Sequence, residues 1–159
     1  MRVLGLDPGI ARMGYGVLEA SRNLVTGCQF GCITTSKTIS QPDRLALIRG
    51  ELVRLIKRTK PDIIAVEKLF FQKNVKTALV VGEARGVALL SAAEAGVPIR
   101  EFTPLEVKQA VTGYGRAEKG QVQRMLKILL ELKTIPKQDD AADALAVAYT
   151  AWLTERSRI

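Results

Sequence analysis

Four acidic residues stand where their carboxylates could do chemistry together. Asp7 and Glu67 each end a short apolar run, RVLGLD and DIIAVE, of the kind that forms a buried strand. Asp140 and Asp143 are three residues apart, which puts both on one face of a helix near its start. An acid that ends an apolar strand is costly to desolvate unless a cation meets it. The pattern therefore indicates one site built from three segments of the chain.

The chemistry that suits this cluster is that of hard divalent cations. Four clustered carboxylates repel one another strongly in a partly buried site, so they need a counter-charge. Ligation by oxygen alone selects Mg²⁺ or Mn²⁺ rather than zinc. Two such ions can activate a water molecule and stabilise the leaving oxygen of a phosphodiester.

Each of these acids also has an ordinary structural role open to it. Asp7 precedes Pro-Gly and could serve only as a turn former, and Glu67 could pair with Lys68 or an arginine. Asp139 or Asp140 could be an N-cap or a first-turn acid that the helix dipole favours. The combination favours the metal site, because the chain has only 16 acids in 159 residues.

The chain contains no histidine, and its 24 Lys and Arg residues give it a formal charge of +8 and a pI near 9.8. Ser-His-Asp and Cys-His nucleophile systems and HExxH zinc sites are therefore excluded. Cys28 and Cys32 have the wrong spacing for a CxxC redox pair or a zinc knuckle. The charge indicates a polyanion as partner, with solubility alone as the alternative.

The positive charge is concentrated between residues 37 and 76, where ten Lys or Arg residues face four acids. Lys68, Lys73 and Lys76 lie near Phe70 in the sequence, and cations beside an exposed aromatic suit phosphate contact and base stacking. Because residues alternate in extended chain, we expect only one of Phe70 and Phe71 to point outward. A polyanion partner and an all-carboxylate metal site together predict a nuclease.

The order of the expected elements predicts an α/β fold with a five-stranded mixed sheet flanked by helices, as one domain over residues 1–159. Three early strands should form an antiparallel meander, and right-handed crossovers should add two parallel strands. Asp43 is the expected N-cap of the first helix. We expect strands at 2–7, 14–20, 24–35, 62–67 and 97–102, and helices from 43 and at 75–95, about 104–112, about 118–132 and 140–155.

The 75–95 helix is apolar nearly all the way round, so one core cannot use every face. We expect one side to pack on the sheet and another on a second subunit. The chain shows no leader and no run of 18 apolar residues. We therefore expect a cytoplasmic protein without membrane contact.

Five stretches, in order, resemble the RuvC family of bacterial Holliday junction resolvases over nearly the whole chain. They are LGLDPGIARMGYGV at 4–17, AVEKLFFQKNVKTAL at 65–79, EARGVALLSA at 83–92, VKQAVTGYGRAEKGQVQRML at 107–126 and DDAADALAVA at 139–148. The resemblance implies an RNase H-like fold, a homodimer and a divalent-metal-dependent endonuclease that nicks two strands of a four-way junction symmetrically. It also implies RuvA and RuvB, the branch-migration proteins, as partners in recombination and repair.

The resemblance also implies roles for single residues. The four catalytic acids fall on Asp7, Glu67, Asp140 and Asp143, since the DxxD spacing selects Asp140 and leaves Asp139 as the cap. The aromatic that inserts at the junction centre falls on Phe70, with Phe71 as its competitor, and the functional lysines fall on Lys108 and Lys119. An RNase H-like nuclease for structured RNA and a non-catalytic junction binder are the alternatives.

Overall fold

The computed structural model describes residues 1–68 and 75–157 of the chain. Its strands are β1 (Arg2–Asp7), β2 (Arg12–Ala20), β3 (Val25–Thr34), β4 (Ile63–Glu67) and β5 (Ile99–Phe102). Its helices are α1 (Gln41–Thr59), α2 (Val75–Glu94), α3 (Pro104–Thr112), α4 (Lys119–Leu129) and α5 (Asp139–Arg156). Each of these elements lies where the sequence predicts one, with ends that differ by a few residues.

The strands of the described residues form one five-stranded sheet in the order β3-β2-β1-β4-β5. The pairs β1–β2 and β2–β3 are antiparallel, while β4 runs parallel to both β1 and β5. The predicted mixed sheet is therefore confirmed. Because Leu6 pairs with Val66 in the parallel ladder, the next residues along, Asp7 and Glu67, come to the same edge.

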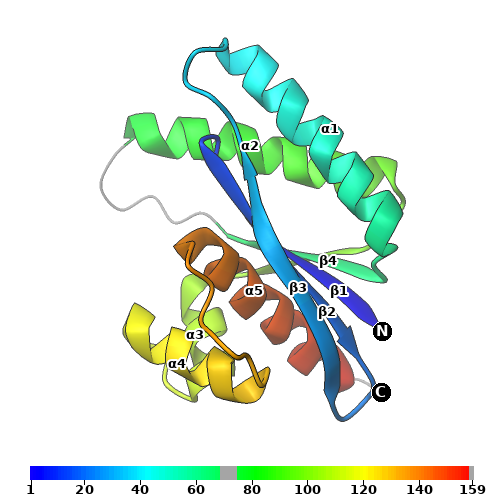
Figure 1. The fold of residues 1–159 in the computed structure, drawn as a ribbon, viewed down its shortest axis with the longest axis vertical. Coiled ribbons are helices and arrows are strands. Elements are labelled where there is room, and N and C mark those ends of the chain that lie inside the picture. Colours follow the sequence, from blue (N-terminus) through cyan, green and yellow to red (C-terminus); the bar gives the residue numbers. More distant parts are fainter. Residues whose placement is uncertain (69–74, 158–159) are drawn as a thin grey trace.

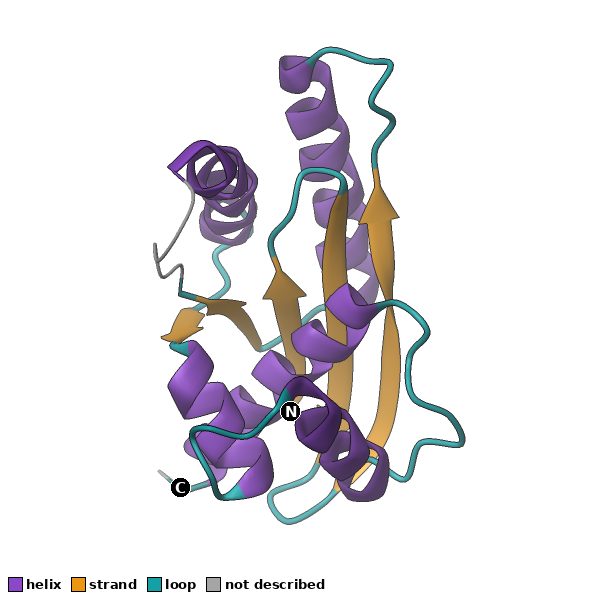
Figure 2. Ribbon diagram, turned by 90° about the vertical axis from the view of Figure 1, so that its left-hand side faces the viewer, coloured by secondary structure: helices purple, strands orange, loops and turns teal. Residues whose placement is uncertain are grey.

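Two apolar cores cover the two faces of the sheet. Leu4, Leu6 and Ile64 face α1 and α2, whereas Val3 and Ala65 face α3, α4 and α5. This alternation follows from the pleat, which turns successive side chains to opposite faces. Figures 1 and 2 show α1 and α2 towards one end of the molecule and the other three helices towards the opposite end.

Glycines on the central strands let α5 approach the sheet closely. A Cβ on Gly5 would overlap with the carbonyl oxygen of Ala144, and one on Gly16 would lie 2.8 Å from the Cα of Leu145. The side chains that α5 buries are also small, and they include Ala141, Ala142, Ala144, Ala146 and Ala148. The alanine-rich stretch of α5 is thus explained by helix-to-sheet packing.

Two predicted helix caps are wrong by one to three residues. Ser40, and not Asp43, is the N-cap of α1, because the Ser40 hydroxyl accepts a hydrogen bond from the Asp43 amide. Pro42 in the first turn suits this start, because it has no amide hydrogen to leave unpaired. Gln138, and not Asp139, is the N-cap of α5, so Asp139 is the first residue of that helix.

Helix α2 is buried on one side and exposes two leucines on the other. Ala84, Ala88 and Ala92 are fully buried, whereas the side chains of Leu79 and Leu90 are 64% and 51% exposed. The exposed leucines are the kind of surface that a second subunit covers. Among the described residues, no helix is long and apolar enough to cross a membrane.

Candidate active site

Asp7 and Glu67 lie side by side at the end of two neighbouring parallel strands. Each is the last residue of its strand, and each is only partly buried, whereas the four residues before it are buried. The backbone amide of Lys68 donates a 2.7 Å hydrogen bond to the carbonyl oxygen of Phe102, which holds the chain in extended form just past Glu67. The edge of the sheet thus fixes the backbone positions from which these two side chains extend.

The N-terminal end of α5 brings Asp140 and Asp143 to the same edge. Gly14 pairs with Asp7 in the antiparallel ladder, and a Cβ on Gly14 would overlap with the carbonyl oxygen of Asp140. Only glycine therefore allows the helix to start directly over the strand that pairs with Asp7. The i, i+3 spacing then turns Asp143 to the same side as Asp140.

The four carboxylates share one electrostatic environment. Burial, reinforced by the negative charges of Asp143, Glu67 and Asp140, raises the pKa of Asp7 to about 8. Burial and the charge of Asp143 also raise the pKa of Glu67. The pKa of Asp143 is raised chiefly by burial, although a hydrogen bond from Lys119 opposes the rise. Without a cation, the cluster therefore favours holding a proton on Asp7 near neutral pH.

Two lysines lie on one side of this cluster. Lys119 Nζ donates a 2.8 Å hydrogen bond to Asp143 Oδ2 and lies 3.4 Å from Asp139 Oδ2. Lys108 is close enough to Glu67 that its charge lowers the pKa of that carboxyl, against the effect of burial. Glu67, Lys108, Lys119 and Asp143 line one cleft of about 240 Å³ together with apolar residues of α3, α4 and α5.

An arginine that the sequence analysis missed lies against the fourth acid of the cluster. Arg12 Nε is 3.0 Å from Asp140 Oδ2, but the approach does not have hydrogen-bond geometry. This Asp140 oxygen is enclosed and has no hydrogen-bond partner. Its signal in the sequence is a basic residue just past the Pro8-Gly9 turn that follows Asp7.

The donor set fits a divalent cation of the Mg²⁺ class. All four groups are carboxylates, and an enclosed carboxylate oxygen without a hydrogen-bond partner is an atom that a cation would satisfy. Within residues 1–68 and 75–157, no three acidic or cysteine side chains converge as ligands of one ion as they stand. Asp140 and Asp143 instead contact Arg12 and Lys119, so their side chains would have to turn from these cations to bind an ion.

Of the remaining predicted residues, one lies near the acids and the others lie outside the described residues. Lys76 lies in the first turn of α2 and lines a hollow that also contains Arg12 and Asp140. Phe70, Phe71 and Lys73 lie outside the described residues. The structure thus brings Lys76, Lys108 and Lys119 to the hollows that border the acids.

The chain is similar to crossover junction endodeoxyribonucleases. Residues 3–151 match the family described as crossover junction endodeoxyribonuclease RuvC. RuvC of Thermosipho melanesiensis is 54% identical over 149 residues, which cover 94% of this chain and 95% of that protein. RuvC of Alkaliphilus oremlandii is 52% identical over 163 residues, which cover 100% and 99%.

A solved structure extends the similarity to three dimensions. The structure of Thermus thermophilus RuvC in complex with a Holliday junction substrate is 35% identical and matches with a TM-score of 0.91. The match covers 99% of this chain and 96% of that one. It therefore includes the sheet edge and the N-terminal end of α5, where the four acids lie.

Proposed function

The chain belongs to the RuvC family of crossover junction endodeoxyribonucleases, and from this premise we propose that it resolves four-way DNA junctions by paired, symmetric nicks. Its mixed sheet and flanking helices are the RNase H-like fold of that family. The T. thermophilus relative is solved with a Holliday junction substrate, which supports junction DNA as the substrate here. The reaction is hydrolysis of DNA phosphodiester bonds, in homologous recombination and DNA repair.

The observation that carries this proposal is the meeting of four carboxylates at one edge of the sheet. Asp7, Glu67, Asp140 and Asp143 come from three elements, and the pKa of Asp7 rises to about 8 because of burial and the other three charges. Such mutual repulsion costs stability, which a purely structural cluster would have no reason to keep. We assign all four as catalytic acids and as ligands of the metal on which the family depends.

Mg²⁺ is the metal that we propose, with Mn²⁺ as a substitute, because both prefer oxygen ligands. When bound, such ions make a water molecule more acidic and stabilise the oxygen that leaves the phosphorus. The protein's own contribution is to hold Asp7 and Glu67 on rigid strand ends and to offer Asp140 and Asp143 from a helix packed on glycine. Lys119 limits the repulsion, since its charge lowers the pKa of Asp7, Glu67 and Asp143.

For DNA contact we propose Phe70, Lys73, Lys76, Lys108 and Lys119. Lys108 and Lys119 border the cleft that contains Glu67 and Asp143, so a phosphate bound there would lie beside the acids. Lys76 borders the hollow on the Asp140 side. The role of Phe70, stacking at the junction centre, comes from the sequence resemblance.

We further propose a homodimer that forms through α2, with RuvA and RuvB as branch-migration partners. A four-way junction has two equivalent strands to nick, so a two-fold dimer would present one carboxylate site to each. The exposed side chains of Leu79 and Leu90 supply the apolar contact.

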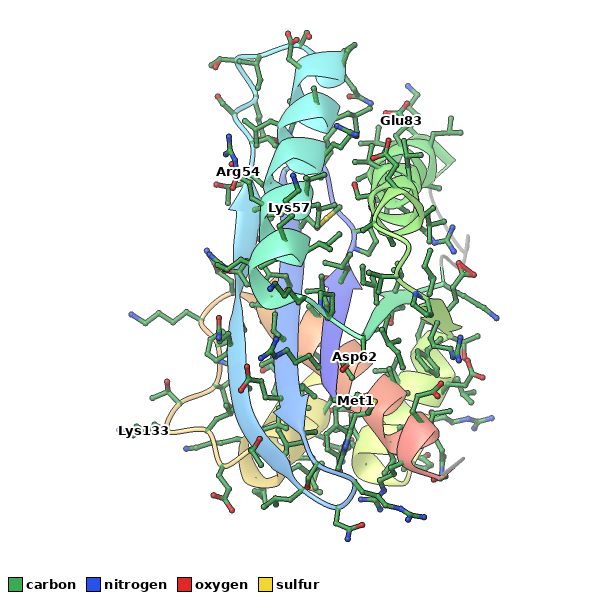
Figure 3. All side chains as sticks on the ribbon, turned by 90° about the vertical axis from the view of Figure 1, so that its right-hand side faces the viewer. Met1, Arg54, Lys57, Asp62, Glu83 and Lys133 are labelled. Carbon is green, nitrogen blue, oxygen red and sulfur yellow. The ribbon has the colours of Figure 1, made fainter. Side chains whose placement is uncertain are left out.

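The test is cleavage of a labelled synthetic four-way junction with and without Mg²⁺ or Mn²⁺, with the cut positions read on both strands. We expect metal-dependent, symmetric cuts that Asp7→Asn abolishes while junction affinity is nearly unchanged. Asp62→Asn is the matched control, because Asp62 lies at the opposite end of the sheet, beside Met1 in Figure 3. Preferred cleavage of structured RNA, or binding without metal-dependent nicks, would contradict the proposal.

A further inference from the structure

Arg12 is a charged residue at the site to which the proposed function gives no role. It begins β2, directly after the turn that follows Asp7. Its Nε lies 3.0 Å from Asp140 Oδ2, and that oxygen is enclosed without a hydrogen-bond partner. The contact therefore depends on charge alone, and a stronger cation could replace the guanidinium at Asp140.

The surroundings of Arg12 form a hollow that is separate from the cleft lined by Lys108 and Lys119, which we call the lysine cleft. It measures about 470 Å³ and is lined by residues 9–12 of the β1–β2 turn, by Asp140 and by four residues from the start of α2. Helix α2 lies on one face of the sheet, whereas α3 and α4, which carry Lys108 and Lys119, lie on the other (Figure 1). The four acids thus have cations on two sides.

The Arg12 side chain has room to change partners. It is 53% exposed, so the guanidinium can turn away from Asp140 without leaving a packed core. A guanidinium presents several N–H groups in a planar fork that matches the oxygens of a phosphate. A divalent ion at Asp140 would repel the guanidinium and favour its rotation towards an anion.

We propose that Arg12 is a positioning residue for DNA: it neutralises Asp140 in the free protein, and it contacts a backbone phosphate once a divalent ion binds at Asp140. The inference rests on the proposed function, because it takes junction DNA as the polyanion. It adds a DNA contact on the α2 side of the acids, opposite the lysine cleft.

The test compares Arg12→Gln with Arg22→Gln. Both variants lose one positive charge. Arg22 is exposed just beyond the other end of β2, and the rise of an extended strand puts it about 30 Å from Arg12. In Mn²⁺ titrations without DNA, Arg12→Gln should bind Mn²⁺ about 3- to 10-fold more tightly, since a competing cation is gone. In junction binding with Ca²⁺ at several salt concentrations, it should lower the slope of log affinity against log salt by about one. Arg22→Gln should change neither quantity.

An unchanged salt slope, or an Mn²⁺ affinity that does not rise, would overturn the inference for Arg12. The two measurements also separate this inference from the proposed function. A wild-type protein that neither binds nor nicks junctions contradicts the proposed function, whereas the Mn²⁺ titrations test the competition at Asp140 without any DNA.

Discussion

Lys119 Nζ donates a 2.8 Å hydrogen bond to Asp143 Oδ2 and lies 3.4 Å from Asp139 Oδ2. One ammonium group at the start of α4 therefore joins two acids that lie one helical turn apart near the start of α5. Its charge also lowers the pKa values of Asp7 and Glu67, which lie on other elements. Asp7, Glu67 and Asp143 thus share the positive charge of Lys119, whereas Asp140 contacts Arg12.

Replacing Lys119 with Gln should shift the pH dependence of nicking to higher pH. Without the ammonium group, the pKa values of Asp7, Glu67 and Asp143 rise further, so the acids stay protonated to higher pH and bind metal less well. We expect nicking to fall about 10- to 100-fold near neutral pH and to recover partly towards pH 9. The measurement is the rate of junction cleavage from pH 6 to 9.

Lys127→Gln is the matched control, because Lys127 is an exposed lysine of the same helix near its other end. It should leave the pH profile unchanged. An equal loss at every pH in Lys119→Gln would mean that Lys119 acts on DNA contact alone and not on the protonation of the acids.

Asp7→Asn should stabilise the metal-free protein at alkaline pH. The pKa of Asp7 rises from 3.8 to about 8 on folding, so its favourable contribution is complete below about pH 4 and is lost as the pH rises through about 8. Asn carries no proton to lose, and the gain over wild type should be on the order of a few kcal/mol at pH 9. Urea unfolding in EDTA at pH 5 and pH 9 measures the difference.

The stabilisation should disappear when Mg²⁺ is added, because the wild-type carboxylates then gain a counter-charge and the variant loses a ligand. Asp62→Asn serves again as the control at the other end of the sheet. A variant that is no more stable than wild type at pH 9 would show that burial and the neighbouring charges do not destabilise the ionised form of Asp7.

Much of the fold could be predicted because its patterns are local. The apolar runs that end at Asp7 and Glu67 identify two strands, and helical spacing identifies α1. The caps were less predictable: Asp43 and Asp139 have N-cap chemistry, but so does Ser40, and only backbone geometry decides which residue comes before the first turn. The start of α5 also depends on tertiary packing, because only a glycine at position 14 leaves room for the carbonyl oxygen of Asp140.

The acids of the candidate site could be predicted from residue patterns, and Lys108 and Lys119 from the family resemblance, but Arg12 could not. Asp7, Glu67, Asp140 and Asp143 stand out because acids rarely interrupt apolar runs. Arginines and lysines are common on any basic protein, so no local pattern separates Arg12 from its neighbours. Its contact with Asp140 depends on two segments that are 128 positions apart in the sequence, and only the fold reveals it.

Gly14→Ala should disturb the site without removing a charged group. The added Cβ would overlap with the carbonyl oxygen of Asp140, so the first turn of α5 has to move away from β2. We expect a loss of about 1–3 kcal/mol in the free energy of unfolding, typical of overpacking, and a larger fractional loss of nicking than of junction binding. Gly27→Ala is the control, because a Cβ there has no atom nearer than 3.9 Å. Equal nicking by the two variants would show that the position of Asp140 tolerates a shift.

Charged substitutions on α2 should separate dimerisation from folding. Leu79→Glu or Leu90→Glu places a carboxylate on a face that is already exposed, so the monomer should keep its free energy of unfolding. If that face forms the dimer, burying an unpaired charge should weaken association by at least about 10-fold in sedimentation experiments. Ile128→Glu is the control, since Ile128 is 69% exposed on α4 and away from α2. The substitutions on α2 should also turn paired nicks into single nicks, because each monomer would then cut one strand independently. A dimer of unchanged affinity in both variants would place the interface on another surface.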